Sequence, residues 1–316
     1  MARAVDIGLH FCELPADGWV ERVRRFEELG FASVTFTDHP GFAPQWDPVA
    51  AVASVAAATS SIRVGTLVLN AALRRPAEVA RAAATVHRAS GGRFDLGLGA
   101  GYVAADFDAV GASFSPTADR LGLLEETCEL LHLLWSQEST TYDGRHVRVH
   151  DAPMAAGEVV RPRLLVGGGG PKVLGVAARH AEIVSMIPRQ DTGTWDPAAS
   201  LGDGTLAAME TKAGWVRQAA SAAGRDPDDL VLHTMAYATA VGDDPRAAMA
   251  AAAAELGVAP DALRDSAFHL VGTADEVVDH LHTWRERTGI SYVSLFEPGD
   301  EQIEYLAARV LPALSG

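Results

Sequence analysis

Four consecutive glycines give the strongest local signal for ligand binding in this sequence of 316 residues. Gly167, Gly168, Gly169 and Gly170 follow a short apolar stretch and precede Pro171, a residue that favours the first turn of a helix. Glycine leaves backbone N–H groups accessible, and the start of a helix carries partial positive charge. The loop therefore predicts a cradle for a phosphate group, and a merely flexible loop is the weaker interpretation.

Asp38 and His39 end another β-rich stretch. Histidine exchanges protons near neutral pH, so His39 with Asp38 beside it is a candidate acid–base pair or cofactor contact. The same two residues are equally compatible with a capped loop and an ordinary polar position. The pair alone favours neither interpretation.

An apolar run that ends at Asn70 is followed by two basic residues, Arg74 and Arg75. The composition favours a buried strand followed by surface arginines at the start of a helix. The alternative is that one of these arginines contacts an anion.

Three glycines alternate at the end of a further β-rich run, at Gly97, Gly99 and Gly101, just before Tyr102. Small residues at a strand end permit a ligand to approach the backbone closely, or they simply allow a tight turn into a helix. The spacing lacks the third glycine of a dinucleotide-binding fingerprint. It is therefore a weak indication of a binding site.

Several common catalytic and metal-binding patterns are missing. The sequence has no cysteine and histidine set with zinc-ligand spacing, no H-E-x-x-H, no Walker A loop and no G-x-S-x-G elbow. We therefore expect no metal site.

The elements that must position these residues alternate between strands and helices. We expect strands at residues 5–11, 33–37, 62–70, 94–99, 164–167, 183–187, 230–241 and 292–296. Eight β–α units in a chain of this length predict a single α/β domain over residues 1–316, closed into a (β/α)8 TIM barrel. In such a barrel, function resides where strands end.

Two insertions are expected in this barrel. One follows the fourth strand and contains a hairpin around Asp143 and Gly144. The other follows the sixth strand and is a polar stretch from Pro188 to Gly204, a candidate substrate loop.

Composition narrows the classes of partner and compartment. The formal net charge is -15, so neither nucleic acid nor an anionic membrane surface is an expected partner. The two cysteines, Cys12 and Cys128, give no disulfide framework, and the sequence shows no signal peptide or membrane-length apolar run. These features predict a cytoplasmic protein that binds small molecules.

Taken in order, the motifs resemble the bacterial luciferase-like superfamily, and among its branches the actinobacterial coenzyme F420-dependent oxidoreductases. The matching segments are Gly30-Phe31-Ala32-Ser33 with Asp38-His39, Gly65 to Asn70 with Arg74-Arg75-Pro76, Ser90 to Phe94, Gly97 to Tyr102, and Val166 to Gly169. The resemblance extends to about His180 and returns near Val271 and Gly289.

This resemblance implies a barrel without metal that holds a reduced flavin or deazaflavin at the carboxyl ends of its strands. Asp38 and His39 would lie at the reactive edge of the cofactor. Leu67 and Val68 would back the ring through a non-prolyl cis peptide bond, and Asn70 would reach its polar edge.

By the same resemblance, Ala100, Gly101 and Tyr102 would lie beside the cofactor, and the loop from Gly167 to Gly170 would hold its phosphate. Tyr102 stands where the sugar-phosphate dehydrogenase branch carries a glutamate, which argues against sugar-phosphate oxidation. A tyrosine at this position can still donate a proton or stack.

The expected function is hydride transfer between the deazaflavin coenzyme F420 and a small organic substrate, with His39, Asp38 and Tyr102 as catalytic residues. One alternative is an FMN-dependent monooxygenase that uses oxygen and receives reduced flavin from a separate reductase. A non-catalytic barrel that binds a cofactor is an alternative of another class. The resemblance also implies a homodimer.

Overall fold

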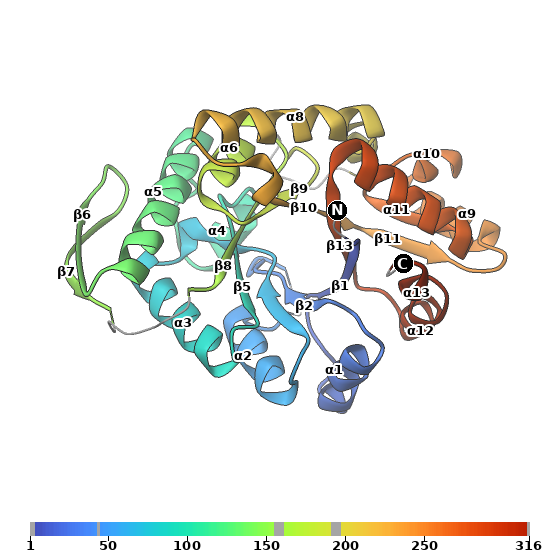
Figure 1. Ribbon diagram of the computed structural model, residues 1–316, viewed down its shortest axis with the longest axis horizontal. Helices are drawn as coiled ribbons and strands as arrows, with labels where there is room; N and C mark the ends of the chain where they lie inside the picture. The colour runs from blue at the N-terminus through green and yellow to red at the C-terminus, as the bar shows by residue number, and fades with distance from the viewer. Residues whose placement is uncertain (1–3, 43–44, 155–160, 191–196, 315–316) are drawn as a thin grey trace.

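Eight parallel strands close into a barrel in the computed structural model, which describes residues 4–42, 45–154, 161–190 and 197–314 (Figure 1). The main sheet has nine strands in the order β3-β2-β1-β13-β10-β9-β8-β5-β4, and β3 also pairs with β5. Since β3 and β4 are two halves of one interrupted strand, the barrel has eight strand positions. The predicted (β/α)8 barrel is confirmed.

The barrel strands lie within a few residues of the positions expected from the sequence. They are β1 (Asp6–Phe11), β2 (Ser33–Phe36), β3 (Arg63–Thr66), β4 (Leu69–Asn70), β5 (Phe94–Gly99), β8 (Arg163–Gly168), β9 (Ile183–Met186), β10 (Val231–Ala236) and β13 (Ile290–Phe296). Neighbouring strands are parallel throughout, as the helical crossovers require.

Helices surround the barrel, and each helix of the ring from α1 to α11 contacts the next. They are α1 (Trp19–Glu28), α2 (Pro48–Ala58), α3 (Pro76–Ala89), α5 (Thr117–Ser136), α6 (Pro171–His180), α8 (Leu206–Ala222), α11 (Ala274–Thr288) and α12 (Asp300–Arg309), which continues as α13 (Leu311–Leu314). The ion pair between Arg25 of α1 and Glu304 of α12, 2.8 Å long, joins the first and last of them. No described helix combines the length and the apolar character that a bilayer crossing needs.

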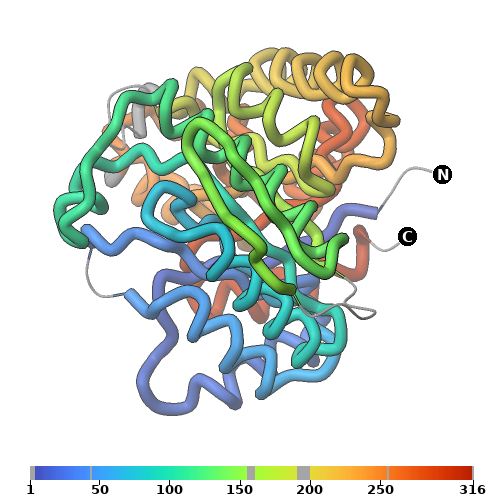
Figure 2. The backbone as a smooth tube through the Cα atoms, turned by 90° about the vertical axis from the view of Figure 1, so that its left-hand side faces the viewer, coloured from blue at the N-terminus to red at the C-terminus, as the bar shows by residue number. Residues whose placement is uncertain are grey.

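The structure contains several further elements besides the barrel strands and these helices. They are α4 (Ala104–Ala109), α7 (Pro197–Asp203), α9 (Arg246–Leu256), α10 (Asp261–Arg264) and the 3-10 turns at Ala71–Leu73 and Pro227–Asp229. An antiparallel hairpin, β6 (Ser139–Asp143) and β7 (Arg148–Pro153), lies against α5 (Figure 2). Its turn is held by Glu126, which accepts three backbone N–H bonds from Arg145, His146 and Val147.

The seventh strand differs from its prediction. A single strand over residues 230–241 was expected, but it breaks at Tyr237 into β10 and β11 (Ala238–Val241). β11 leaves the barrel and pairs with β12 (His269–Gly272), a strand that the sequence pattern did not predict. The Tyr237 N–H donates to the Phe268 carbonyl at 2.8 Å, so the chain changes sheets at this residue.

The interior of the barrel is more polar than the Val, Ile and Leu layers that usually fill one. Along each strand, alternate residues face inward and outward, and the outward set packs on the helices. Among the inward side chains, His233 contacts Ser185 (2.8 Å) and Ser294 (3.0 Å), and His10 contacts Thr35 (2.9 Å). Burial lowers the pKa of both histidines to about 3, so they are neutral at physiological pH.

Candidate active site

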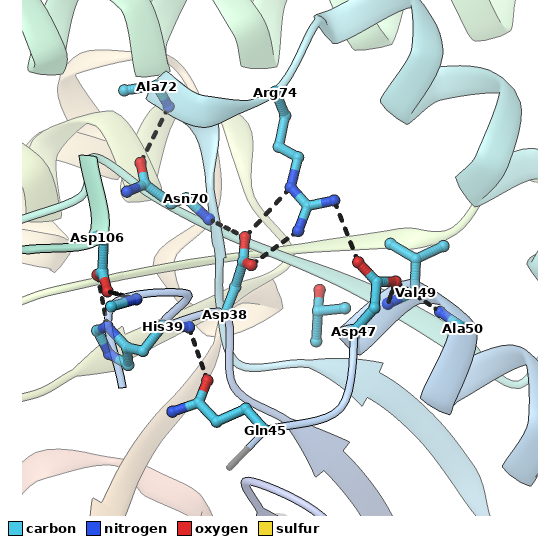
Figure 3. Close-up of polar contacts among 12 residues, drawn as sticks. Asp38, His39, Gln45, Asp47, Val49, Ala50, Asn70, Ala72, Arg74 and Asp106 are labelled. Atoms are coloured by element: carbon cyan, nitrogen blue, oxygen red, sulfur yellow. Dashed lines mark hydrogen bonds and ion pairs between the residues drawn. The ribbon is translucent and has the colours of Figure 1, made fainter. Parts of the chain in front are cut away.

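His39 follows β2 at the carboxyl end of the barrel, and a carboxylate from α4 holds its ring (Figure 3). Its Nδ1 lies 2.7 Å from Oδ2 of Asp106, whose Oδ1 accepts the Gly41 N–H at 3.0 Å. The Asp106 side chain is 1% exposed, whereas that of His39 is 29% exposed. Because a carboxylate only accepts hydrogen bonds, this contact needs the proton on Nδ1 and does not involve Nε2.

Asp38 is engaged by its own protein neighbours rather than exposed to a ligand. It is buried and accepts the Asn70 N–H at 3.0 Å and an Arg74 guanidinium N–H at 2.7 Å. Arg74 also lies 3.7 Å from Asp47, whose side chain caps α2. Asp38 thus ties the end of β2 to β4 and, through Arg74, to the start of α2. The partners of Arg74 are protein carboxylates.

Asn70 presents a polar atom that the described residues leave unsatisfied. Its Oδ1 accepts the Ala72 N–H at 3.1 Å, but its buried Nδ2 has no partner among them. A Cβ atom at Gly101, where φ is +72°, would lie 2.5 Å from this nitrogen, so glycine keeps the space open. An unpaired buried donor is costly. A ring with carbonyl oxygens at its edge, such as a flavin or deazaflavin, fits this position.

The interruption between β3 and β4 is a cis peptide bond between Leu67 and Val68, as the family resemblance implies. Two glycines of β5 make room for it. A Cβ at Gly99 would lie 2.7 Å from a methyl group of Val68, and one at Gly97 would lie 1.9 Å from the Thr66 carbonyl oxygen. Packing of the interrupted strand therefore accounts for these two glycines, without a ligand.

The glycine-rich loop is partly explained by packing as well. A Cβ at Gly168 would lie 2.2 Å from the Val173 side chain, and one at Gly169 would lie 2.5 Å from the Arg189 nitrogen. A Cβ at Gly167 would lie at ordinary van der Waals distance from the Val68 side chain. A Cβ at Gly170 would have no atom within 4 Å. Space therefore opens at Gly170, directly before α6.

Tyr102 lies beside His39, with ring centroids 5.8 Å apart and planes at 86°. Burial, together with the nearby Asp106, raises the pKa of Tyr102 to about 12. The hydroxyl is therefore protonated throughout the physiological range and can donate a hydrogen bond. Ala100, the residue before Gly101, is half-buried and packs against the core.

Together these contacts bring most of the predicted site residues to one end of the barrel. Asp38, His39, Asn70 and Tyr102 form one connected group, and Asp106 is the member that the sequence did not reveal. The only available signal was an acidic residue in the first turn of a helix after a glycine-rich strand end. The predicted substrate loop at 188–204 contains residues 191–196, which lie outside the described residues.

Away from this end, α5 and α6 carry three side chains that could in principle coordinate a metal ion. The coordinating atoms of Glu125, Glu129 and His180 lie within 4.8 Å of one another. Arg179 donates to Glu125 at 2.5 Å, so a cation already holds that carboxylate.

The comparisons with known proteins agree with this architecture. Residues 10–266 match the family model for luciferase-like monooxygenase. The chain is 36% identical to the F420-dependent glucose-6-phosphate dehydrogenase of Kineococcus radiotolerans, over 49% of this chain and 48% of that protein. It is 30% identical to the F420-dependent hydroxymycolic acid dehydrogenase of Mycobacterium tuberculosis, over 79% of this chain and 66% of that protein.

The alignments with the glucose-6-phosphate dehydrogenases thus span about half the length of those relatives. A solved F420-dependent secondary alcohol dehydrogenase, in complex with an F420–acetone adduct, superposes with a TM-score of 0.81. The superposition covers 98% of this chain and 99% of the dehydrogenase chain, at 19% sequence identity, a likeness that shows the fold. On the family match over most of its length, the chain belongs to the luciferase-like monooxygenase family.

Proposed function

We propose that this protein is an oxidoreductase that transfers a hydride between coenzyme F420 and a small organic substrate. The observation that carries the proposal is that the His39–Asp106 pair and the unsatisfied Nδ2 of buried Asn70 lie at the same end of the barrel (Figure 3). A proton-exchanging group and a ring-edge donor are two features through which a protein can assist hydride transfer on a deazaflavin. The names of the relatives above, which are F420-dependent, support the choice of cofactor.

The cofactor would lie across the carboxyl end of the barrel. Leu67 and Val68 would support one face of the ring, and Asn70 would donate to its polar edge. Ala100, Gly101 and Tyr102 would lie alongside it. The phosphate would occupy the space at Gly170, where the first turn of α6 leaves N–H groups without helical partners.

When bound, the deazaflavin supplies a carbon centre that accepts or donates a hydride. His39 Nε2 would take the proton from a substrate hydroxyl, or return it to a carbonyl oxygen, while Asp106 holds the ring and stabilises its protonated form. Tyr102 would hydrogen-bond the same substrate oxygen, since its raised pKa keeps it protonated. Asp38 would act as a positioning residue through Arg74 and Asn70.

A binding titration tests the cofactor assignment. We would follow intrinsic tryptophan fluorescence as purified protein is titrated with the deazaflavin and, separately, with oxidised and reduced FMN. Saturable binding of the deazaflavin in preference to FMN is expected. Tighter binding of reduced FMN would replace the proposal with a flavin monooxygenase, and binding of neither would overturn it.

Two matched variants locate the phosphate. Gly170 and Gly299 are both N-cap residues with negative φ and no atom within 4 Å of a Cβ. Aspartate is a favourable N-cap, so neither Gly170→Asp nor Gly299→Asp should unfold the protein. We expect Gly170→Asp to weaken deazaflavin binding by roughly tenfold or more through charge repulsion at the phosphate. Equal effects of the two variants would refute this placement.

We further propose that the protein is a cytoplasmic homodimer made of one domain, with a separate reductase renewing its cofactor. Both cysteines in the chain, Cys12 and Cys128, are free thiols, which suits a reducing compartment. Light scattering on the purified protein gives the mass that tests the dimer.

A further inference from the structure

Aromatic rings form two contacting groups at the carboxyl end of the barrel. We call the following six residues the aromatic belt: Phe42, His39, Tyr102, Tyr237, Phe296 and His10. The ring centroids of His39 lie 5.6 Å from Phe42 and 5.8 Å from Tyr102. Those of Phe296 lie 6.2 Å from Tyr237 and 5.6 Å from His10. The Tyr102 hydroxyl contributes to the raised pKa of Tyr237, so the two groups of rings lie near each other.

Three rings of the belt are uncharged at neutral pH. Burial lowers the pKa of His10 to about 3 and raises that of Tyr102 to about 12, and the pKa of the buried Tyr237 is also raised. Val68 and Met235 continue the apolar surface from the belt into the barrel. Apart from the Asp106 carboxylate, a ligand at His39 would therefore be surrounded mainly by neutral rings and apolar side chains.

The nearby cations are committed to protein partners. Arg74 is paired with Asp38. Arg120 donates to the Gly101 carbonyl at 2.8 Å, and its guanidinium lies 4.0 Å from the centre of the Phe114 ring.

Two cations near the end of β9 are also held within the protein. Lys212 is buried and lies 2.5 Å from Asp203 and 2.7 Å from the Ile187 carbonyl oxygen. Arg189 likewise has a partner within the chain. A phosphorylated or carboxylated substrate would have to displace these partners to gain a counter-charge from any of these four residues.

The outer end of the belt opens onto apolar surface. The Phe42 side chain is 52% exposed, and the other exposed large hydrophobic residues among those described are Val110 and Phe114. All three follow barrel strands at the carboxyl end, on the loop after β2 and around α4. The two segments are in contact, because a Cβ at Gly41 would lie 2.7 Å from the Ala105 backbone.

We propose that the substrate is an uncharged alcohol or carbonyl compound with an apolar alkyl or aryl group next to the reacting carbon, and that Phe42 contacts this group. The inference rests on the proposed function, because it takes His39 as the group that meets the substrate oxygen. A phosphorylated substrate would find Arg74, Arg120 and Lys212 already held by protein partners.

A homologous series of ligands tests the substrate class. We would titrate the deazaflavin-loaded protein with secondary alkanols from butanol to decanol and with alkyl phosphates of the same chain lengths, following cofactor fluorescence. Each buried methylene should tighten alkanol binding about fourfold until the apolar surface is filled. Tighter binding of the alkyl phosphates, a series that does not depend on chain length, or no binding of either would overturn the inference.

Variants of Phe42 give the contact its own test. Because this side chain is half exposed, its replacement does not threaten the core. Phe42→Ala should reduce affinity for the longest alkanols by roughly tenfold and leave the shortest nearly unaffected, and Phe42→Leu should retain most of the chain-length dependence. An equal loss for short and long alkanols in Phe42→Ala would show that Phe42 does not contact the apolar group.

The series is repeated by saturation-transfer NMR on protein without cofactor, which separates the two proposals. Failure of the deazaflavin to bind would overturn the proposed function, and the NMR series would still decide the substrate class. A flat series on protein that does bind the deazaflavin would overturn only the substrate class.

Discussion

Asp106→Asn is the most informative single substitution, because it changes the partner of His39 while keeping its size. The asparagine can still accept the Gly41 N–H through its oxygen, but its NH2 group then faces His39 Nδ1, which lies 2.7 Å from the carboxylate in the wild type. The ring must lose this bond or change tautomer. A charge-assisted hydrogen bond is worth about 1.5–3 kcal/mol. We therefore expect a loss of roughly tenfold to 150-fold in kcat/KM.

The assay is a steady-state measurement of deazaflavin absorbance with the best alkanol of the ligand series. A positioning role predicts that kcat falls while KM changes little, since Asp106 is buried behind His39. Nitrogen-15 NMR of the histidines should show a changed tautomer ratio for His39 in the variant. This signal would not move if Asp106 were important only for folding.

A double-mutant cycle tests whether Asp106 acts through His39. If Asp106 acts through His39, then adding Asp106→Asn to a His39→Gln variant should cost little further activity. Equal losses in both backgrounds, or an unchanged kcat in Asp106→Asn, would refute the reasoning. Urea unfolding of each variant shows whether a loss of activity reflects a loss of folded protein.

Three further predictions concern stability. The pKa of His10 and His233 falls from 6.5 to about 3 on folding, because both side chains are buried. The free energy of unfolding should therefore be highest above pH 6.5 and fall as the pH decreases toward 3, by up to about 1.4 kcal/mol per pH unit for each histidine. Urea unfolding at a series of pH values would measure this decline. Arg74→Met should lower the free energy of unfolding by about 3 kcal/mol, because it leaves the buried Asp38 without its ion-pair partner. Adding Asp38→Asn to this variant should recover part of the loss, and a double variant whose loss equals the sum of the two single losses would contradict the prediction. Gly99→Ala should cost about 1–3 kcal/mol through its clash with Val68, and thermal unfolding of the Val68→Ala double variant should show partial rescue.

Much of the architecture could be predicted because hydrophobic period and turn residues act locally. The strand at residues 94–99 and the helix at residues 171–180 occur where the pattern placed them, since apolar runs and Pro171 are signals within the segment itself. The break at Tyr237 could not be predicted in this way. The run through residue 241 remains favourable for a strand, and only the arrival of β12, more than thirty residues later in the chain, gives its second half a different partner.

The glycines show why composition misleads at a site. Gly97 and Gly99 have the spacing of a ligand-binding strand end, yet their missing side chains are required by the neighbouring strand, at Thr66 and Val68. Gly101, two residues further on, faces the Asn70 amide instead. All three belong to one alternating pattern in the sequence, and only the register between β4 and β5 separates packing from function.

Asp106 illustrates the same limit for the acid–base pair. Sequence adjacency suggested that Asp38 is the carboxylate that works with His39, but adjacent residues at a strand end point to opposite faces. Asp38 accordingly turns toward Arg74 and β4, while the ring of His39 turns toward a helix that follows β5. Its true partner, 67 positions along the chain, is brought close because the loops after β2 and β5 meet above the short, interrupted strand between them. That strand, made of β3 and β4, is the one interrupted at the cis peptide bond between Leu67 and Val68.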